Sequence, residues 1–324
     1  MLATIVRRLL QTIVVMLVMS ALVFAGIYMV GDPVSMLASP EATEAQRAAI
    51  RASLGLDLPL WRQYLIFMGQ AVRGDFGNSF LTGEPAMHLI LERMPATVEL
   101  ACVAMLMSVL IGVPLGIRAG LRPEAPGSRA IMTGSVLGFS LPNFWVGLML
   151  IMVFAVMLGW LPAGGRGQTV SIGALQLSVL TFDGWLSLAL PAATIAFAKC
   201  AMIIRVTRAA TREALPMDYI KFARAKGLSE KRVLGVHLLK NILIPVVTVA
   251  GLEFGQVMAF AVVTETVFSW PGMGKLLIDS IINLDRPVVV AYLLLIVFFL
   301  VMLNLLVDII YTVLDPRVRL DSRR

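Results

Sequence analysis

The chain has 324 residues, of which 59% are hydrophobic and only 15% are charged, and its mean hydropathy is +0.88. These values exclude an ordinary soluble domain and predict an integral membrane protein. The formal net charge of +7 does not indicate nucleic-acid binding, because in a membrane chain the position of the basic residues matters more than their sum.

The first predicted span is the apolar run over residues 9–30, which is long enough for one helical crossing at about 20 residues. A cleavable signal peptide is the competing interpretation. The run continues directly into Gly31-Asp32-Pro33 and is longer than a signal-peptide core, which favours an uncleaved helix. Residues 31–94 then read as a water-soluble region, in which Arg73-Gly74-Asp75 resembles an integrin-binding tripeptide but is interpreted as a turn.

Five further apolar segments follow, at residues 95–117, 130–160, 184–204, 242–267 and 288–314. The third span of the chain, residues 130–160, is expected to tilt or kink at Pro142. Six helical crossings make the predicted fold an all-α integral membrane protein and place both termini on one side of the membrane.

The basic residues indicate which side that is. Of the 27 lysines and arginines, 19 lie on the side of the termini, mostly in residues 118–129 and 199–240. The positive-inside rule therefore predicts cytoplasmic termini. The expected organisation is a tail with the first helix (1–30), an extracytoplasmic region (31–94), a core of helices 2–6 (95–314) with a cytoplasmic loop at 205–241, and a cytoplasmic C-terminal tail (315–324).

The cytoplasmic loop carries the most unusual sequence of the chain, a polar and basic segment between two apolar ones. Tyr219, Phe222 and Ala223 recur at helical spacing and predict a short amphipathic helix over residues 218–226. Gly227 is expected to end that helix, because glycine accepts the left-handed conformation found at helix ends.

A second short helix is predicted beyond this turn. Ser229 is a suitable N-cap, Glu230 favours the positive end of the helix, and Val233, Leu234 and Leu238 supply an apolar stripe. An interfacial helix pair resting on anionic lipid is one interpretation. The small residues Ala223 and Ala225 favour the other, in which the backbone of a partner protein approaches closely.

Motifs for catalysis and metal binding are not found. Residues 271–275 faintly resemble a phosphate-binding loop but lack its first glycine and its final hydroxyl residue, and Cys102, Cys200, His88 and His237 are too scattered for a zinc site. Ionisable residues inside spans often serve transport, and here they are few. They are Lys199, Glu253, Glu265 and Asp308. Glu265 and Asp308 lie near predicted helix ends and Lys199 can snorkel, so these three can reach the interface. Glu253 is the deep one, and its competing interpretation is a packed carboxyl bonded to a neighbouring helix. Asn143, Glu253 and Glu265 are the candidate pathway residues.

The cytoplasmic loop resembles the signature loop of permease subunits in ATP-binding-cassette importers, in the form found in the subfamily for peptides, opines and nickel. Ala223, Gly227 and Leu239 keep family positions, whereas Lys221, Phe222, His237 and Lys240 depart from the general signature. The resemblance covers nearly the whole chain through Gly31-Asp32-Pro33, Gly55-Leu56-Asp57, Gly74-Asp75-Phe76-Gly77, Pro95-Ala96-Thr97 with Glu99, and Glu265-Thr266 with Pro271-Gly272-Met273-Gly274.

This resemblance implies a type I importer permease in a bacterial inner membrane, with no catalytic residue and no cofactor of its own. It implies a homologous second permease, cytoplasmic ATPase subunits that bind ATP and Mg, an extracytoplasmic substrate-binding protein, and a lipid environment. The cargo would be dipeptides, oligopeptides or glutathione, or alternatively nickel chelates or opines. The residues implied for contact with the ATPase are Asp218, Tyr219, Ala223, Arg224, Ala225, Lys226, Gly227, Leu228, Ser229 and Glu230. An ion-driven secondary carrier and a non-transporting scaffold are the rival hypotheses.

Overall fold

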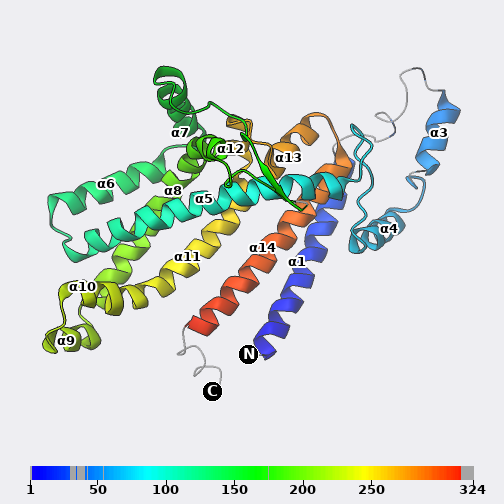
Figure 1. Cartoon of the computed structure of the whole chain (residues 1–324). Coiled ribbons are helices and arrows are strands. Elements are labelled where there is room, and N and C mark those ends of the chain that lie inside the picture. The colour runs from blue at the N-terminus through cyan, green and yellow to red at the C-terminus, as the bar shows by residue number, and fades with distance from the viewer. Residues whose placement is uncertain are drawn as a thin grey trace. The chain divides into compact units, whose positions relative to one another are not determined.

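The computed structural model describes residues 2–29, 34, 41, 43–53, 55–173 and 175–314, and helices dominate it (Figure 1). Gly31-Asp32-Pro33 and the expected C-terminal tail lie outside these residues. The helices are α1 (Leu2–Met29), α3 (Glu44–Ser53), α4 (Leu60–Val72), α5 (Ala86–Leu121), α6 (Pro126–Ser140), α7 (Asn143–Leu150), α8 (Phe182–Ala214), α9 (Asp218–Ala225), α10 (Glu230–Arg232), α11 (Leu239–Phe260), α12 (Val262–Val267), α13 (Met273–Ile282) and α14 (Arg286–Leu314), with π-helical turns η1 (Ile151–Met157) and η2 (Val233–Leu238). The strands β1 (Val170–Ile172) and β2 (Leu175–Leu177) form a small antiparallel hairpin.

Within the described residues, four helices are long and apolar enough to cross a membrane: Ala86–Leu121, Phe182–Ala214, Glu230–Phe260 and Arg286–Val307. A fifth is obtained if α6 and α7 with η1 are counted as one broken span. The first predicted crossing falls on α1, which has 28 residues and contains the shorter apolar stretch Leu10–Gly26. The all-α membrane fold expected from the sequence is confirmed.

The third predicted span differs from its expectation. The sequence predicts one helix kinked at Pro142, but the chain bends by 104° between α6 and α7. Leu141 is extended, with φ −81° and ψ 133°, because the ring of a following proline disfavours the helical conformation. The position of the break is therefore confirmed. The bend is large enough that the predicted span consists of two separate helices.

The fifth predicted span is displaced at both ends. It begins earlier, because α10, η2 and α11 form one continuous helix over Glu230–Phe260. It also ends earlier, since Ala261 separates α11 from the short α12. Between the fifth and sixth predicted spans the chain forms the ten-residue helix α13.

The chain divides into two compact units, of which unit 1 comprises residues 1–94 and 275–301. Here α1 packs on α4, with the Phe24 and Tyr64 rings 5.3 Å apart and the Ser20 and Tyr64 hydroxyls 2.8 Å apart. The Arg73-Gly74-Asp75 segment is a turn, as expected, in which the Asp75 carboxylate accepts a hydrogen bond from the Gly77 N–H at 3.0 Å.

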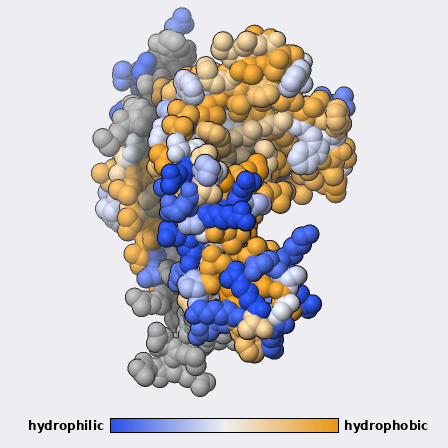
Figure 2. All heavy atoms as spheres, turned by 90° about the vertical axis from the view of Figure 1, so that its left-hand side faces the viewer, coloured by the Kyte–Doolittle hydropathy of each residue, from blue (hydrophilic) through white to orange (hydrophobic). Residues whose placement is uncertain are grey.

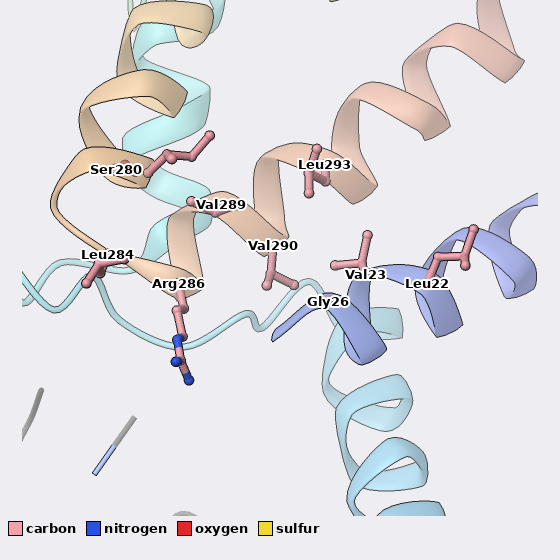
Figure 3. A pocket seen from close by; sticks show the side chains of 10 residues that line it. Leu22, Val23, Gly26, Ser280, Leu284, Arg286, Val289, Val290 and Leu293 are labelled. Atoms are coloured by element: carbon pink, nitrogen blue, oxygen red, sulfur yellow. The ribbon is translucent and has the colours of Figure 1, made fainter. Parts of the chain in front are cut away.

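Unit 1 also contains an apolar cavity of about 390 Å³ between α1, α13 and α14. Figure 3 shows Leu22 and Val23 of α1 facing Val290 and Leu293 of α14, while the guanidinium of Arg286 points away from them. The lining is almost wholly hydrocarbon, so it suits apolar side chains or lipid rather than a polar substrate.

Unit 2 comprises residues 95–274 and 302–324 and is built around α8, on which α6, α7 and α11 pack. Figure 2 shows that hydrophobic residues cover the upper part of one face, while hydrophilic residues gather from about mid-height downward, including the height at which Figure 1 places α9 and α10. On this face the surface around the loop that joins α8 to α11 is therefore polar.

A ladder of glycines lets α5 approach α8 closely. Gly112, Gly116 and Gly120 recur every four residues, and a Cβ at Gly116 would lie only 2.5 Å from the Cβ of Thr207. Small residues at this spacing allow the backbones of membrane helices to come close, where van der Waals contacts hold them together.

We expect Gly116→Ala to destabilise the protein by about 1–3 kcal/mol, because the added methyl group must push the two helices apart. The measurement is the thermal unfolding midpoint of the purified protein in detergent. Gly134→Ala on α6 is the matched control, since its Cβ would meet no atom within 4 Å and alanine favours a helix. An equal loss of stability at Gly134 would contradict the close-approach explanation.

Candidate functional site

The helix, turn and helix predicted for the loop between α8 and α11 are present in unit 2. α9 covers Asp218–Ala225, Lys226 follows as its C-cap, and Gly227 has φ +75°. The turn is closed by hydrogen bonds from the Gly227 N–H to the Arg224 carbonyl (2.9 Å) and from the Leu228 N–H to the Ala223 carbonyl (3.3 Å). The left-handed conformation expected at Gly227 is confirmed.

The face that α9 buries differs from the predicted one. Ile220 and Ala223 are buried, in a cluster with Val233 and Leu238 of η2. The predicted apolar stripe is therefore right for Ala223 but wrong for Tyr219 and Phe222, and the Phe222 side chain is 62% exposed. α9 carries apolar residues on both sides, so spacing alone cannot show which side packs inward. Tyr219 and Phe222 therefore form an aromatic surface that the described residues leave exposed.

Charged side chains surround this aromatic surface. The Arg224 guanidinium donates two hydrogen bonds to the Glu230 carboxylate across the turn, at 2.8 and 3.3 Å. The Lys226 ammonium lies 4.5 Å from the centre of the Phe222 ring. Ser229 occupies the N-cap position of α10 but its side chain makes no capping bond. Partial burial raises the pKa of the Tyr219 phenol, so it is neutral near pH 7.

A second site forms where two motifs far apart in the sequence meet. The Thr97 hydroxyl of α5 donates to the Glu265 carboxylate at 2.6 Å and accepts from the Met273 N–H at 2.8 Å. The Trp270 indole donates to the Ala96 carbonyl at 2.9 Å. Glu265 is fully buried, which corrects the expectation that it reaches the interface from a helix end, because α12 directs it into unit 2 rather than outward.

Glu99 and Arg166 add an ion pair to this site. The Glu99 carboxylate accepts from the Arg166 guanidinium (2.8 Å), the Ser178 hydroxyl and N–H (both 2.7 Å) and the Val179 N–H (2.6 Å). Arg166 also lies 5.8 Å from the centre of the Trp270 ring. These bonds tie the loop around the β1–β2 hairpin to α5. Sequence reasoning included Glu99 in a motif but gave Arg166 no role.

A third site lies within the spans, where Lys199 of α8 pairs with Glu253 of α11 at 2.6 Å. The Lys199 ammonium also donates to the Gln256 side-chain oxygen at 3.2 Å. This pairing corrects the expectation that Lys199 reaches the membrane surface. It bears out the alternative given for Glu253, that of a carboxyl bonded to a neighbouring helix.

Two polar-lined cavities adjoin this ion pair. One, of about 220 Å³, and another, of about 300 Å³, share Asn143, Lys199 and Gln256 in their walls, and Glu253 lines the larger one. We call the two together the polar cavity. Of the candidate pathway residues, Asn143 and Glu253 are thus brought together, whereas Glu265 lines neither cavity. In the described part of the chain, no three His, Cys, Asp or Glu side chains are placed to hold a metal ion.

Comparison with known families shows to which family this chain belongs. Residues 112–320 match the family described as "Binding-protein-dependent transport system inner membrane component", and residues 1–101 match the N-terminal family of the same membrane component. The chain belongs to this family of transport permeases. It is therefore a membrane component of a binding-protein-dependent transport system, which its apolar helices fit.

Curated relatives match this permease over nearly its whole length. It is 41% identical to the di/tripeptide transport system permease protein DppB of Pseudomonas aeruginosa, over 98% of this chain and 99% of that one. It is 38% identical to the oligopeptide permease AppB of Bacillus subtilis and 39% identical to the glutathione permease GsiC of Escherichia coli, with the same coverages.

A solved structure supports the fold. A chain of the MetNI methionine ABC transporter, in its inward-facing conformations, superposes with a TM-score of 0.54 at 17% identity, covering 71% of this permease and 97% of that chain. At this identity the similarity bears on the fold alone, and it agrees with a type I importer permease.

Proposed function

We propose that this permease carries short peptides from an extracytoplasmic binding protein into the cytoplasm, as one subunit of an ATP-driven importer. The observation that carries the proposal is the 38–41% identity, over 98% of the chain, to permeases named for di/tripeptide, oligopeptide and glutathione transport. These names favour peptides over the nickel chelates and opines that the sequence left open.

ATP and Mg would be bound by separate cytoplasmic subunits. Met217, Tyr219 and Phe222 form an exposed apolar surface on and next to α9, and basic residues surround it. Exposed apolar surface rimmed by charge is typical of a protein interface. We infer that this surface, with the turn at Gly227, contacts an ATPase subunit and transmits its closure to α8 and α11.

The remaining partners follow from the expected topology. Cytoplasmic termini place the region at residues 31–94 outside the cytoplasm, where a substrate-binding protein would dock. A homologous second permease would complete the pathway through the inner membrane.

Proteoliposomes that contain the permease with its encoded partner subunits and binding protein test this function. We expect uptake of a radiolabelled tripeptide that requires ATP and the binding protein. Uptake driven by a proton or sodium gradient without ATP would instead favour a secondary carrier. Binding of the ATPase without any flux of peptide, nickel chelate or opine would favour a scaffold.

A further inference from the structure

The ion pair between Lys199 and Glu253 is unusual because of where it lies. Each residue belongs to a helix apolar enough to span the membrane, and charged side chains inside spans are costly and mark functional pathways. Apolar residues would tie two helices together without the desolvation penalty that an ion pair carries. A purely structural role therefore does not account for the charges.

The pair is open to the polar cavity rather than sealed from it. The side chains of Lys199 and Glu253 are 18% and 13% exposed, and both line the larger cavity. A lysine ammonium has three donors. Among the described residues, Lys199 donates to Glu253 and Gln256, so its third donor can bind a ligand. Asn143 and Gln256 add side-chain amides, which can bond to peptide groups.

We propose that Lys199 and Glu253 form a binding site for the terminal charges of a short peptide in transit, with Lys199 holding the carboxylate and Glu253 the ammonium. This inference rests on the proposed function. The charges balance, because the Lys199–Glu253 ion pair is replaced by two pairs, one of Lys199 with the peptide carboxylate and one of Glu253 with the peptide ammonium, while the peptide termini give up their water. No uncompensated charge enters the span.

Distance makes the exchange depend on a movement. The two charged groups are in contact at 2.6 Å, whereas the ends of an extended tripeptide are about 10 Å apart. Both termini can be held only when the ion pair opens, and the flexible stems of lysine and glutamate permit this. The site recognises the backbone ends and is indifferent to side chains, as a carrier of varied peptides requires.

The test compares trialanine with its C-terminal amide and its N-acetyl form in the reconstituted importer, each supplied on preloaded binding protein. The binding protein is the same throughout, so its own preference cancels between variants. The measured quantity is the discrimination against a blocked peptide, which is the rate of trialanine uptake divided by the rate of uptake of the blocked form. We expect Lys199→Gln to lower the discrimination against the amide by about tenfold, equivalent to about 1.4 kcal/mol. The discrimination against the N-acetyl form should be unchanged. Glu253→Gln should show the reverse pattern.

Two further variants keep the test decisive. Arg129→Gln, which breaks an exposed ion pair with Glu124, should leave both discriminations at their wild-type values. The apolar double variant Lys199→Met with Glu253→Leu retains a packed contact without charge. If this variant assembles and its trialanine uptake falls about tenfold or more, the binding site is supported. If it takes up trialanine at the wild-type rate, the ion pair only holds α8 and α11 together and the binding site is overturned.

Failure of this inference can be told apart from failure of the proposed function. If the wild-type importer carries trialanine but the single variants keep its discrimination, the charge-binding site is overturned and the peptide function stands. If the wild-type importer does not discriminate between free and blocked peptides, the site is overturned as well. If it carries no peptide at all, the proposed function itself has failed.

Discussion

Gly227→Val is expected to reduce ATP-driven uptake about tenfold or more while the chain still inserts in the membrane. Gly227 has φ +75°, a conformation that a β-branched residue resists at a cost of about 1–3 kcal/mol. A Cβ at this position would meet no atom within 4 Å. The destabilisation therefore comes from backbone strain in the turn between α9 and α10 and not from a steric clash with a neighbouring atom. The measurements are peptide uptake in proteoliposomes and the amount of ATPase that copurifies.

A graded series at the same position separates the turn from other causes. Asparagine tolerates the left-handed conformation better than alanine, and alanine better than valine. We therefore expect uptake to fall in the order Gly227, Gly227→Asn, Gly227→Ala, Gly227→Val. An asparagine variant as inactive as the valine variant would indicate that the ATPase touches Gly227 itself, and normal uptake by the valine variant would refute the coupling role.

Glu99→Ala is expected to destabilise the protein by about 3–5 kcal/mol, the cost of leaving one partner of a buried ion pair behind. The Glu99 and Arg166 side chains are only 3% and 10% exposed. The change also removes the acceptor of the Ser178 and Val179 N–H groups. Thermal unfolding measures the loss, and hydrogen exchange should rise at the β1–β2 hairpin.

An exposed carboxylate provides the control for this prediction. Glu124 pairs with Arg129 at 3.2 Å and is 88% exposed, so Glu124→Ala should change stability by less than about 1 kcal/mol. A variant at Glu99 that is as stable as the one at Glu124 would contradict the importance of the buried network.

Local sequence rules predict local features of this protein well. The turn at Gly227 and the break at Pro142 each depend on the backbone preference of one residue, and both are found where expected. The apolar spans follow from composition in the same way. Their ends do not, because α8 and the helix through α11 continue beyond the apolar runs into polar sequence.

Pairings between distant residues could not be predicted from the sequence. Lys199 and Glu253 are 54 positions apart and Thr97 and Glu265 are 168 apart, and each meets its partner only through helix packing. The exposure of Phe222 could not be predicted for the same reason, since it depends on Val233 and Leu238 covering the other side of α9. Family motifs marked Thr97 and Glu265 as important without showing that they bond to each other.

Lys199 and Glu253 lie on the two helices that the loop carrying α9 connects, so the angle between these helices sets the distance between the two charges. Lys199 lies 15 residues, or about 22 Å, from the C-terminal end of α8 at Ala214, and Glu253 lies 23 residues, or about 35 Å, from Glu230. A change of about 15° in the angle between the helices, as large as known subunit rotations, moves a point 22 Å from the pivot by about 6 Å. A small rotation at the loop between α8 and α11 is thus large enough to separate the two charges.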